Sequence, residues 1–483
     1  MAASIAQTVS APAAVAAHAV SRPVRVVYGV GSIAYGAAAQ GLTSMLLLFY
    51  SQVVGLPAPA VGAALMVALV LDAIFDPLLG QWSDNVRSRW GRRHPFMYAS
   101  AVPCAIAFYA LWHPPTALSG TTLFAYMLAL LVIVRLFTAM YEIPSAALAP
   151  ELSRDYHLRT RLFAVRTYFG TIAGGLMMVL LNVVFLRHDA THPLGVLNRA
   201  GYSEWGSIAA GMILASILWS SWSTHRLIPT LAAPPRRPSG VSAILAEVIG
   251  TLRNPSFLAL MVSGLVSNIA GGIAAALNPY MTLYFWGLSP QVAGLMLLAY
   301  GPAVYIGAVY ARRVTVRFGK KPAMIGLSAA SLIVSLAPIA LRLAGAMPAN
   351  GSPLLIPILL ADQFLVVTFN TMTSVILASM FADLADDNAV RTGARAVGLL
   401  FALNGLIPKI STGAGAFGGS ALIAMVGFPA QAQQGTVAQS VLHALGLAYL
   451  PVVAVLYAIS IAVIVFYRID RAAHEANVAQ LAG

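Results

Sequence analysis

Long apolar stretches, separated by short polar segments, recur along nearly the whole chain. Each is about 20 residues long or longer, the length that a helix needs to cross a hydrocarbon layer of about 30 Å. Each should be helical, because a helix satisfies its own backbone hydrogen bonds in lipid. We count twelve such spans, at residues 26–54, 59–82, 96–113, 121–149, 163–186, 206–226, 256–286, 290–311, 323–343, 353–381, 396–426 and 441–467.

The composition agrees with a chain that lies in a bilayer. Hydrophobic residues make up 59% of it and charged residues only 9%, whereas soluble domains carry about 25% charged residues. We therefore predict an all-α integral membrane protein in contact with lipid. The single cysteine, Cys104, allows neither an internal disulfide nor a multi-cysteine metal site. No nucleophile triad or zinc helix is recognisable, so we expect neither enzymatic activity nor a cofactor.

The net charge of +13 follows the spacing of the spans. Most of the 28 Lys and Arg residues lie in every second connecting segment, beginning with Arg22 and Arg25 before the first span. Cytoplasmic loops of membrane proteins are enriched in these residues. We therefore predict a multi-pass protein of the cell (inner) membrane with both termini in the cytoplasm, and no nucleic-acid partner. Residues 1–21 lack a basic region before their apolar letters, which favours a disordered tail over a cleaved signal.

Two short matches relate the halves of the chain. The segment RSRWGRRHP at 87–95 resembles TVRFGKKP at 315–322, which aligns Arg89 with Arg317, 228 positions apart. The second match aligns Glu151-Leu152 and Arg159-Thr160 with Asp383-Leu384 and Arg391-Thr392, 232 positions apart. Because the offsets are nearly equal and the segments follow the second and fourth spans of each half, we predict a duplicated unit of six helices.

The duplication divides the chain into five predicted regions. They are a disordered cytoplasmic tail at 1–23, a six-helix bundle at 24–227, a Pro-rich cytoplasmic linker at 228–255, a second six-helix bundle at 256–467 and a cytoplasmic tail at 468–483. Two pseudo-symmetric bundles around a central site are the plan of an alternating-access transporter. We expect the repeated basic loops to control the conformational change, through Asp84, Arg89, Gly91, Arg92, Arg317 and Gly319.

Two carboxylates, Asp72 and Asp76, lie inside the second span, in DAIFDPLLG. Counted from Asp84 at the cytoplasmic end, they lie about 18 and 12 Å into the membrane. Their spacing of four residues places both on one helix face, where two like charges repel unless a cation lies between them. Ionised groups inside a membrane are costly and usually functional. The pair is therefore a candidate site for H⁺ or Na⁺, with a structural ion pair to Arg135 as the alternative.

Four more charged residues lie within apolar spans. Glu142 precedes Pro144, which frees a backbone carbonyl, and could complete the cation site. Arg166 has aromatic neighbours and is a candidate anchor for a hydroxyl or carboxylate group, or else an arginine that snorkels to the surface. Lys409 lies too deep to reach either surface. Asp362 is the best available counter-ion for Lys409, as a structural pair or as a substrate contact.

At this point several motifs resemble a known family. YGVGS at 28–32, DAIFDPLLG at 72–80, RSRWGRRHP at 87–95 and Glu-Ile-Pro at 142–144 resemble the glycoside-pentoside-hexuronide:cation symporters, over nearly the full length. The resemblance implies the major facilitator fold. By position, it implies that Asp72 and Asp76 bind the cation, that Glu142 serves both cation and sugar, and that Arg166 and Lys409 contact the substrate.

The chain also departs from the family pattern. Gly36 and Ala146 stand where the best-known member has a sugar-binding Asp and a Trp, and Ala139 replaces a threonine of the cation site. Arg135 stands where a small residue is usual. The resemblance therefore implies a sugar, glycoside or uronate as substrate, but not a galactoside pocket, and the loss of the Ala139 hydroxyl weakens a Na⁺ site.

Three functions remain to be distinguished. The first is a cation-coupled symporter, acting as a monomer, that carries a small sugar-like molecule with H⁺ or Na⁺. The second is a transporter of the same fold for another cargo, such as a lysolipid or an amphipathic metabolite. The third, a passive channel or membrane scaffold, has no need of a central carboxylate pair.

Overall fold

Helices form almost all of the structure, a computed structural model that describes residues 22–152, 156–187, 195–230, 254–392, 397–433 and 435–469. The first half consists of α1 (Arg22–Val30), α2 (Ser32–Ser44), α3 (Leu46–Leu48), the π-helical turn η1 (Phe49–Val54), α4 (Ala58–Asn85), α5 (His94–Leu111), α6 (Gly120–Leu152), α7 (Tyr156–Leu180), the π-helical turn η2 (Leu181–Phe185), α8 (Arg199–His225) and the short 3-10 turn η3 (Ile228–Thr230). The second half consists of α10 (Pro255–Tyr280), the π-helical turn η4 (Met281–Phe285), α11 (Pro290–Met296), the 3-10 turn η5 (Leu297–Ala299), α12 (Tyr300–Phe318), α13 (Lys320–Leu343), α14 (Leu355–Thr392), α15 (Val397–Met425) and α16 (Gln439–Ile464).

Each predicted span coincides with a helical segment. Among the described residues, ten helices are long and apolar enough to cross a membrane, and the bent pair Pro23–Ser44 and Leu46–Val54 makes an eleventh. The remaining predicted span, 396–426, coincides with the 29-residue α15. The prediction of an all-helical membrane protein is therefore confirmed. Most of the predicted tails and of the linker lies outside the described residues, so the region boundaries and the membrane orientation stay predictions.

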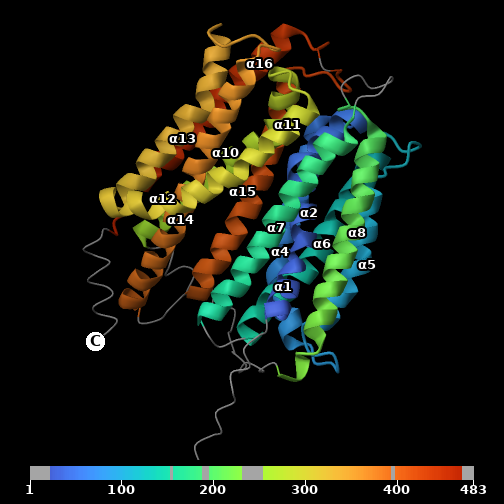
Figure 1. Ribbon diagram of the computed structural model, residues 1–483, viewed down its shortest axis with the longest axis vertical. Coiled ribbons are helices and arrows are strands. Elements are labelled where there is room, and N and C mark those ends of the chain that lie inside the picture. Colours follow the sequence, from blue (N-terminus) through green and yellow to red (C-terminus); the bar gives the residue numbers. More distant parts are fainter. Residues whose placement is uncertain are drawn as a thin grey trace, which may run out of the picture.

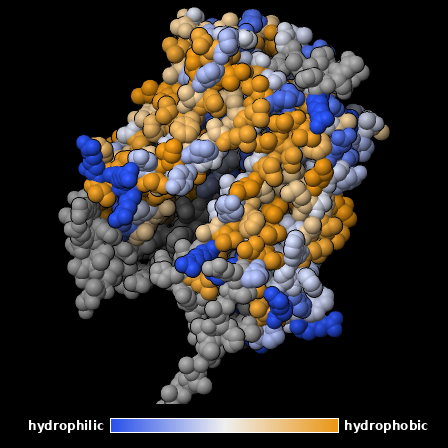
Figure 2. Space-filling model, in the orientation of Figure 1, coloured by the Kyte–Doolittle hydropathy of each residue, from blue (hydrophilic) through white to orange (hydrophobic). Residues whose placement is uncertain are grey.

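The helices form two bundles, α1–α8 and α10–α16, that meet at one end and diverge at the other (Figure 1). The diverging end carries the two basic turns, between α4 and α5 and between α12 and α13, and we call it the basic end. We call the opposite one the closed end. The surface is hollowed between the bundles (Figure 2). If the predicted orientation holds, the hollow faces the cytoplasm.

The seam between the bundles runs along α4 and α15, which pack against each other. Glycines on both helices permit the close approach. A Cβ atom added to Gly413 would lie 3.2 Å from Cβ of Leu69, and one added to Gly62 would lie 3.1 Å from Cα of Phe417. Small residues at helix contacts are the usual means of tight packing in membranes. The seam therefore fixes which side chains of α4 and α15 face each other.

At the closed end the bundles are also joined by hydrogen bonds. The hydroxyls of Ser51 and Tyr280 lie 2.5 Å apart, and the side chain of Gln52 accepts from the Ala432 amide at 3.0 Å. Nearby, Gln291 donates to the Leu186 carbonyl at 2.7 Å. These contacts close the hollow at this end.

Candidate functional site

Both predicted carboxylates of α4 face the centre of the molecule. Asp72 is buried, with 4% of its surface exposed, whereas the Asp76 side chain is 30% exposed. Pro77 follows Asp76 inside the helix and lacks an amide hydrogen, so the ladder of helical hydrogen bonds is interrupted there. The pair thus has one member that is accessible from the hollow and one that is not.

Lys409 of α15 binds both carboxylates. Its Nζ atom lies 2.9 Å from Oδ2 of Asp72 and donates a hydrogen bond to Oδ2 of Asp76. Nη1 of Arg135, on α6, lies 4.0 Å from the same oxygen of Asp72. Two carboxylates therefore face two cations, one of which belongs to the other bundle. Among the described residues, the two ion pairs of Lys409, with Asp72 and with Asp76, are the only ones that join the bundles.

The prediction that Asp362 is the counter-ion of Lys409 is wrong in this structure. α14 and α15 are neighbours in sequence, but α14 packs mainly on α12 and α13, while α15 packs on α4 and α10. Lys409 therefore faces the first bundle. Oδ1 of Asp362 is buried and has no hydrogen-bond partner among the described residues.

Glu142 and Arg166 form a second pair, within the first bundle. Arg166, which is 4% exposed, donates to Glu142 and, at 2.5 Å, to the hydroxyl of Ser145. Its guanidinium carbon lies 5.2 Å from the centre of the Tyr28 ring. Arg166 is thus held inside the bundle rather than snorkelling to the surface. Glu142 was expected to complete the cation site with Asp72 and Asp76. In the structure its partner is Arg166, and among the described residues it shares no cation with the two aspartates.

Tyr35 of α2 lies near both groups of charges and was not among the residues predicted from the sequence. It is 44% exposed and lies within electrostatic reach of Glu142, Arg135, Lys409 and Asp72. The available signal was a tyrosine within the small-residue run SIAYGAAA.

The basic end confirms that the two halves are built alike. Arg92 binds Glu151 at 2.7 Å in the first bundle, and Lys320 binds Asp383 at 2.6 Å in the second. Arg92 and Lys320 are equivalent in the first sequence match, and Glu151 and Asp383 are equivalent in the second. Gly91 and Gly319, which are also equivalent, have φ values of 72° and 81° that favour glycine.

The remaining residues of the predicted loops also make their contacts within their own bundle. Asp84 binds Arg93, which also binds Glu151 at 3.1 Å. The guanidinium of Arg89 lies over the Trp90 ring, and that of Arg317 lies over the Phe318 ring. Each of these contacts remains within one bundle.

Comparisons with known proteins agree with this architecture. Residues 27–471 match the model of the family described as MFS/sugar transport protein. The chain is 26% identical over 465 residues to "Putative glycoside/cation symporter YagG" of Escherichia coli strain K12, which covers 94% of this chain and 93% of the relative. It is 23% identical to the isoprimeverose transporter of Lactiplantibacillus pentosus, over 89% of this chain and 85% of the relative. An uncharacterized symporter of a Synechocystis strain is 30% identical, but that match spans only 46% of this chain and 43% of the relative.

Solved structures show the same fold at low sequence identity. A partially occluded inward open conformation of the xylose transporter XylE from E. coli has a TM-score of 0.60 and 13% identity, covering 93% of this chain and 98% of that one. The nucleoside transporter NupG has a TM-score of 0.61 and 12% identity, covering 91% and 98%. The predicted major facilitator fold is confirmed.

The names of the relatives decide between the broad classes. They are transporters, symporters, carriers, importers or exporters, so the expectation of a transporter rather than an enzyme is confirmed. The resemblance seen in the sequence motifs is confirmed as well. With a family model that matches nearly its full length, the chain belongs to the MFS/sugar transport protein family.

Proposed function

We propose that this protein is a proton-coupled symporter of a sugar or glycoside. The observation that carries the proposal is the Lys409 bridge, because it links the candidate cation site on α4 to the opposite bundle. An ion that competes with Lys409 for Asp76 changes a contact between the two bodies that must move in alternating access. The relatives named as a glycoside/cation symporter and an isoprimeverose transporter support the substrate class.

The geometry supplies a route from ion binding to substrate binding. Asp76 is open to the hollow, so a proton can reach it while Asp72 stays buried. Protonation removes the charge of Asp76 and weakens its hold on the Lys409 ammonium. The Lys409 ammonium stays paired with Asp72, and the hydrogen that it no longer donates to Asp76 can then bond to a substrate hydroxyl in the hollow. By thermodynamic linkage, a substrate that binds the protonated form more tightly also tightens the binding of the proton.

The donor set favours a proton over Na⁺. Lys409 and Arg135 already neutralise the two carboxylates, and a metal ion brought between them would meet two fixed positive charges. Ala139 offers no hydroxyl ligand where the cation-site threonine is expected. A proton needs only one oxygen, and Oδ1 of Asp76, which is buried within the partly exposed side chain, has no hydrogen-bond partner among the described residues.

Transport assays in reconstituted vesicles test the proposal. Isoprimeverose and methyl β-glucoside serve as labelled probes, with an imposed pH gradient in one arm and a Na⁺ gradient in the other. We expect uphill accumulation with the pH gradient alone. Asp76→Asn should abolish accumulation while exchange of the probe across the membrane continues. Glu204→Gln, which likewise replaces a carboxylate by its amide but at an exposed position of α8, serves as the control.

Three outcomes would contradict the proposal. Accumulation driven only by Na⁺ would assign the other ion. Full accumulation by a protein that carries both Asp72→Asn and Asp76→Asn would make the carboxylate pair structural. Absence of transport of any neutral glycoside by the wild-type protein would refute the substrate class.

A further inference from the structure

A cavity of about 530 Å³ lies between the bundles, nearer the closed end than the charged cluster. Its volume falls in the range of small-molecule sites, about 300–1,000 Å³. α2 contributes Gln40 and Ser44, which lie about 7.5 and 13.5 Å further along that helix than Tyr35. A substrate that touches the charged cluster can therefore extend into this cavity.

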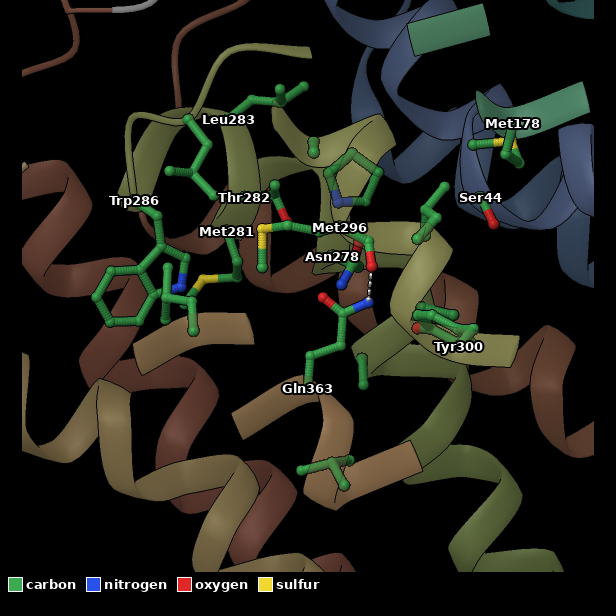
Figure 3. A pocket seen from close by; sticks show the side chains of 18 of the residues that line it. Ser44, Met178, Asn278, Met281, Thr282, Leu283, Trp286, Met296, Tyr300 and Gln363 are labelled. Carbon is green, nitrogen blue, oxygen red and sulfur yellow. Dashed lines mark hydrogen bonds between the residues drawn. The ribbon is translucent and has the colours of Figure 1, made fainter. Parts of the chain in front are cut away.

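The polar groups of the cavity come mainly from the second bundle. Asn278 of α10 and Gln363 of α14 point toward one another in Figure 3, and Gln363 donates to the Met296 carbonyl at 3.4 Å. Tyr300 and Thr282 lie nearby in the same view. Alanine, aliphatic and methionine side chains, with Trp286, form most of the remaining wall. This combination of an apolar wall with a few convergent polar groups is typical of a binding pocket.

Among the described residues that line the cavity, Asp362 is the only charged one. Its Oδ1 atom is buried without a hydrogen-bond partner, and the described residues offer it no ion pair. An unpaired carboxylate in such surroundings destabilises the folded protein. An ionised carboxylate only accepts hydrogen bonds, so what it lacks is a donor. Hydroxyl groups of a sugar are donors of this kind.

The cations near the path of a substrate are already engaged. Arg166 donates to Glu142 and Ser145, and Lys409 binds Asp72 and Asp76. A substrate carboxylate would therefore find no unpaired cation at these two positions, and it would meet the negative charge of Asp362 in the cavity. Like charges brought together at a binding site cost several kcal/mol.

We propose that Asp362, with Asn278 and Gln363, forms a substrate subsite that accepts the hydroxyl hydrogens of a neutral sugar and excludes anionic sugars. This inference rests on the proposed function and narrows its substrate class, since it removes uronates. The subsite belongs to the second bundle, whereas the ion site belongs mainly to the first. A substrate that occupies both regions would join the bundles as Lys409 does.

Binding to the purified full-length protein tests the inference with a matched pair of probes. Methyl β-glucoside and methyl β-glucuronide differ only at C6, as a hydroxymethyl group or a carboxylate, and isoprimeverose is a second neutral probe. We expect the wild-type protein to prefer the glucoside by at least about tenfold. In Asp362→Asn the preference should fall to within about threefold of unity, because the repulsion is gone. Glu204→Gln should keep the wild-type preference.

Thermal unfolding separates a binding role from a structural one. Asp362→Asn removes a partly buried charge that has no partner among the described residues, so without ligand it should unfold at the same temperature as the wild type or at a higher one. A lower unfolding temperature would indicate an unseen structural partner and would overturn the inference. Asn278→Ala provides a second variant, which should weaken binding of both neutral probes about equally.

The remaining outcomes are also decisive. If the wild type binds the neutral probes and Asp362→Asn leaves the glucoside-to-glucuronide ratio unchanged, the subsite is refuted and the proposed function stands. A wild-type preference for the glucuronide refutes the subsite in the same way. If the wild type binds none of the probes, the proposed sugar substrate itself fails.

Discussion

The ion pairs at the centre of the molecule and those at its basic end differ in what they connect. Lys409 reaches from the second bundle to Asp72 and Asp76 of the first. Arg92 with Glu151, and Lys320 with Asp383, each join helices of the same bundle. The chain therefore uses one kind of interaction for two purposes. Pairs within a bundle keep it rigid, whereas a pair between bundles must break when they move.

The largest effect is expected when the central bridge is removed by Lys409→Gln. Without the ammonium, Arg135 remains beside Asp72, but Asp76 loses its cation and faces the charge of Asp72, so Asp76 should stay protonated over the working pH range. A site that never releases its proton cannot couple, so the accumulation ratio in vesicles with a pH gradient should fall to about 1. Exchange of the probe should continue.

Lys321→Gln provides the control for this variant, because the Lys321 ammonium donates to the Val465 carbonyl in the second bundle. It should accumulate the probe as the wild type does. Undiminished accumulation by Lys409→Gln would show that the bridge has no part in coupling.

The second prediction uses Arg166 and Glu142, which are central but lie in one bundle. Either Arg166→Gln or Glu142→Gln alone leaves a charge without its partner and should destabilise the protein by about 3 kcal/mol. The double variant should recover most of that stability, because no unpaired charge remains. It should still fail to bind the neutral probes, since the proposed guanidinium anchor is gone.

Thermal unfolding and binding, measured on the same three samples, separate the two effects. Recovery of both stability and binding in the double variant would show that the pair is structural. A loss of coupled accumulation with normal probe binding would assign Arg166 and Glu142 to the ion site.

The third prediction concerns the basic end, where the halves are built alike. Glu151→Gln and Asp383→Asn each remove the acceptor of a largely buried pair, which should cost about 1–3 kcal/mol of folding free energy. Because the pairs are equivalent, the two losses should be similar. Neither variant should change the accumulation ratio. A change in that ratio with normal stability would place these pairs in the coupling mechanism.

Much of this architecture could be predicted from the sequence. The apolar spans are long and the membrane imposes helices, so all twelve helical segments could be located. The offsets of 228 and 232 residues predicted equivalent loops, and the Arg92–Glu151 and Lys320–Asp383 pairs agree with that prediction. The four-residue spacing of Asp72 and Asp76 placed both on one face of α4. These features depend on local periodicity or on repetition, which a single chain displays.

The partners of buried charges were harder to predict. Lys409 and Asp76 lie 333 positions apart, and they meet because α15 packs on α4 at glycines. Sequence proximity favoured Asp362 instead, which lies on α14, a helix that packs mainly on α12 and α13 rather than on α15. The position of Tyr35 near both groups of charges also depends on packing between helices, which the sequence pattern of one helix does not contain.

The smallest effect is expected for Arg89, in the exposed turn between α4 and α5 at the basic end. In this structure its guanidinium lies 5.6 Å from the centre of the Trp90 ring, and no carboxylate binds it among the described residues. An exposed contact of this kind contributes about 0.5–1 kcal/mol, so Arg89→Ala should leave binding of the probes unchanged.

If the loop holds the bundles together when the basic end closes, the variant should transport about two- to fivefold more slowly, since only that state loses a contact. Arg317→Ala, its equivalent over Phe318, should behave similarly, and Arg87→Ala serves as an exposed control in the same loop. Initial transport rates and equilibrium binding, measured side by side, decide the matter. Weaker binding at an unchanged rate would place Arg89 with the residues that contact substrate and would remove the loop from the conformational change.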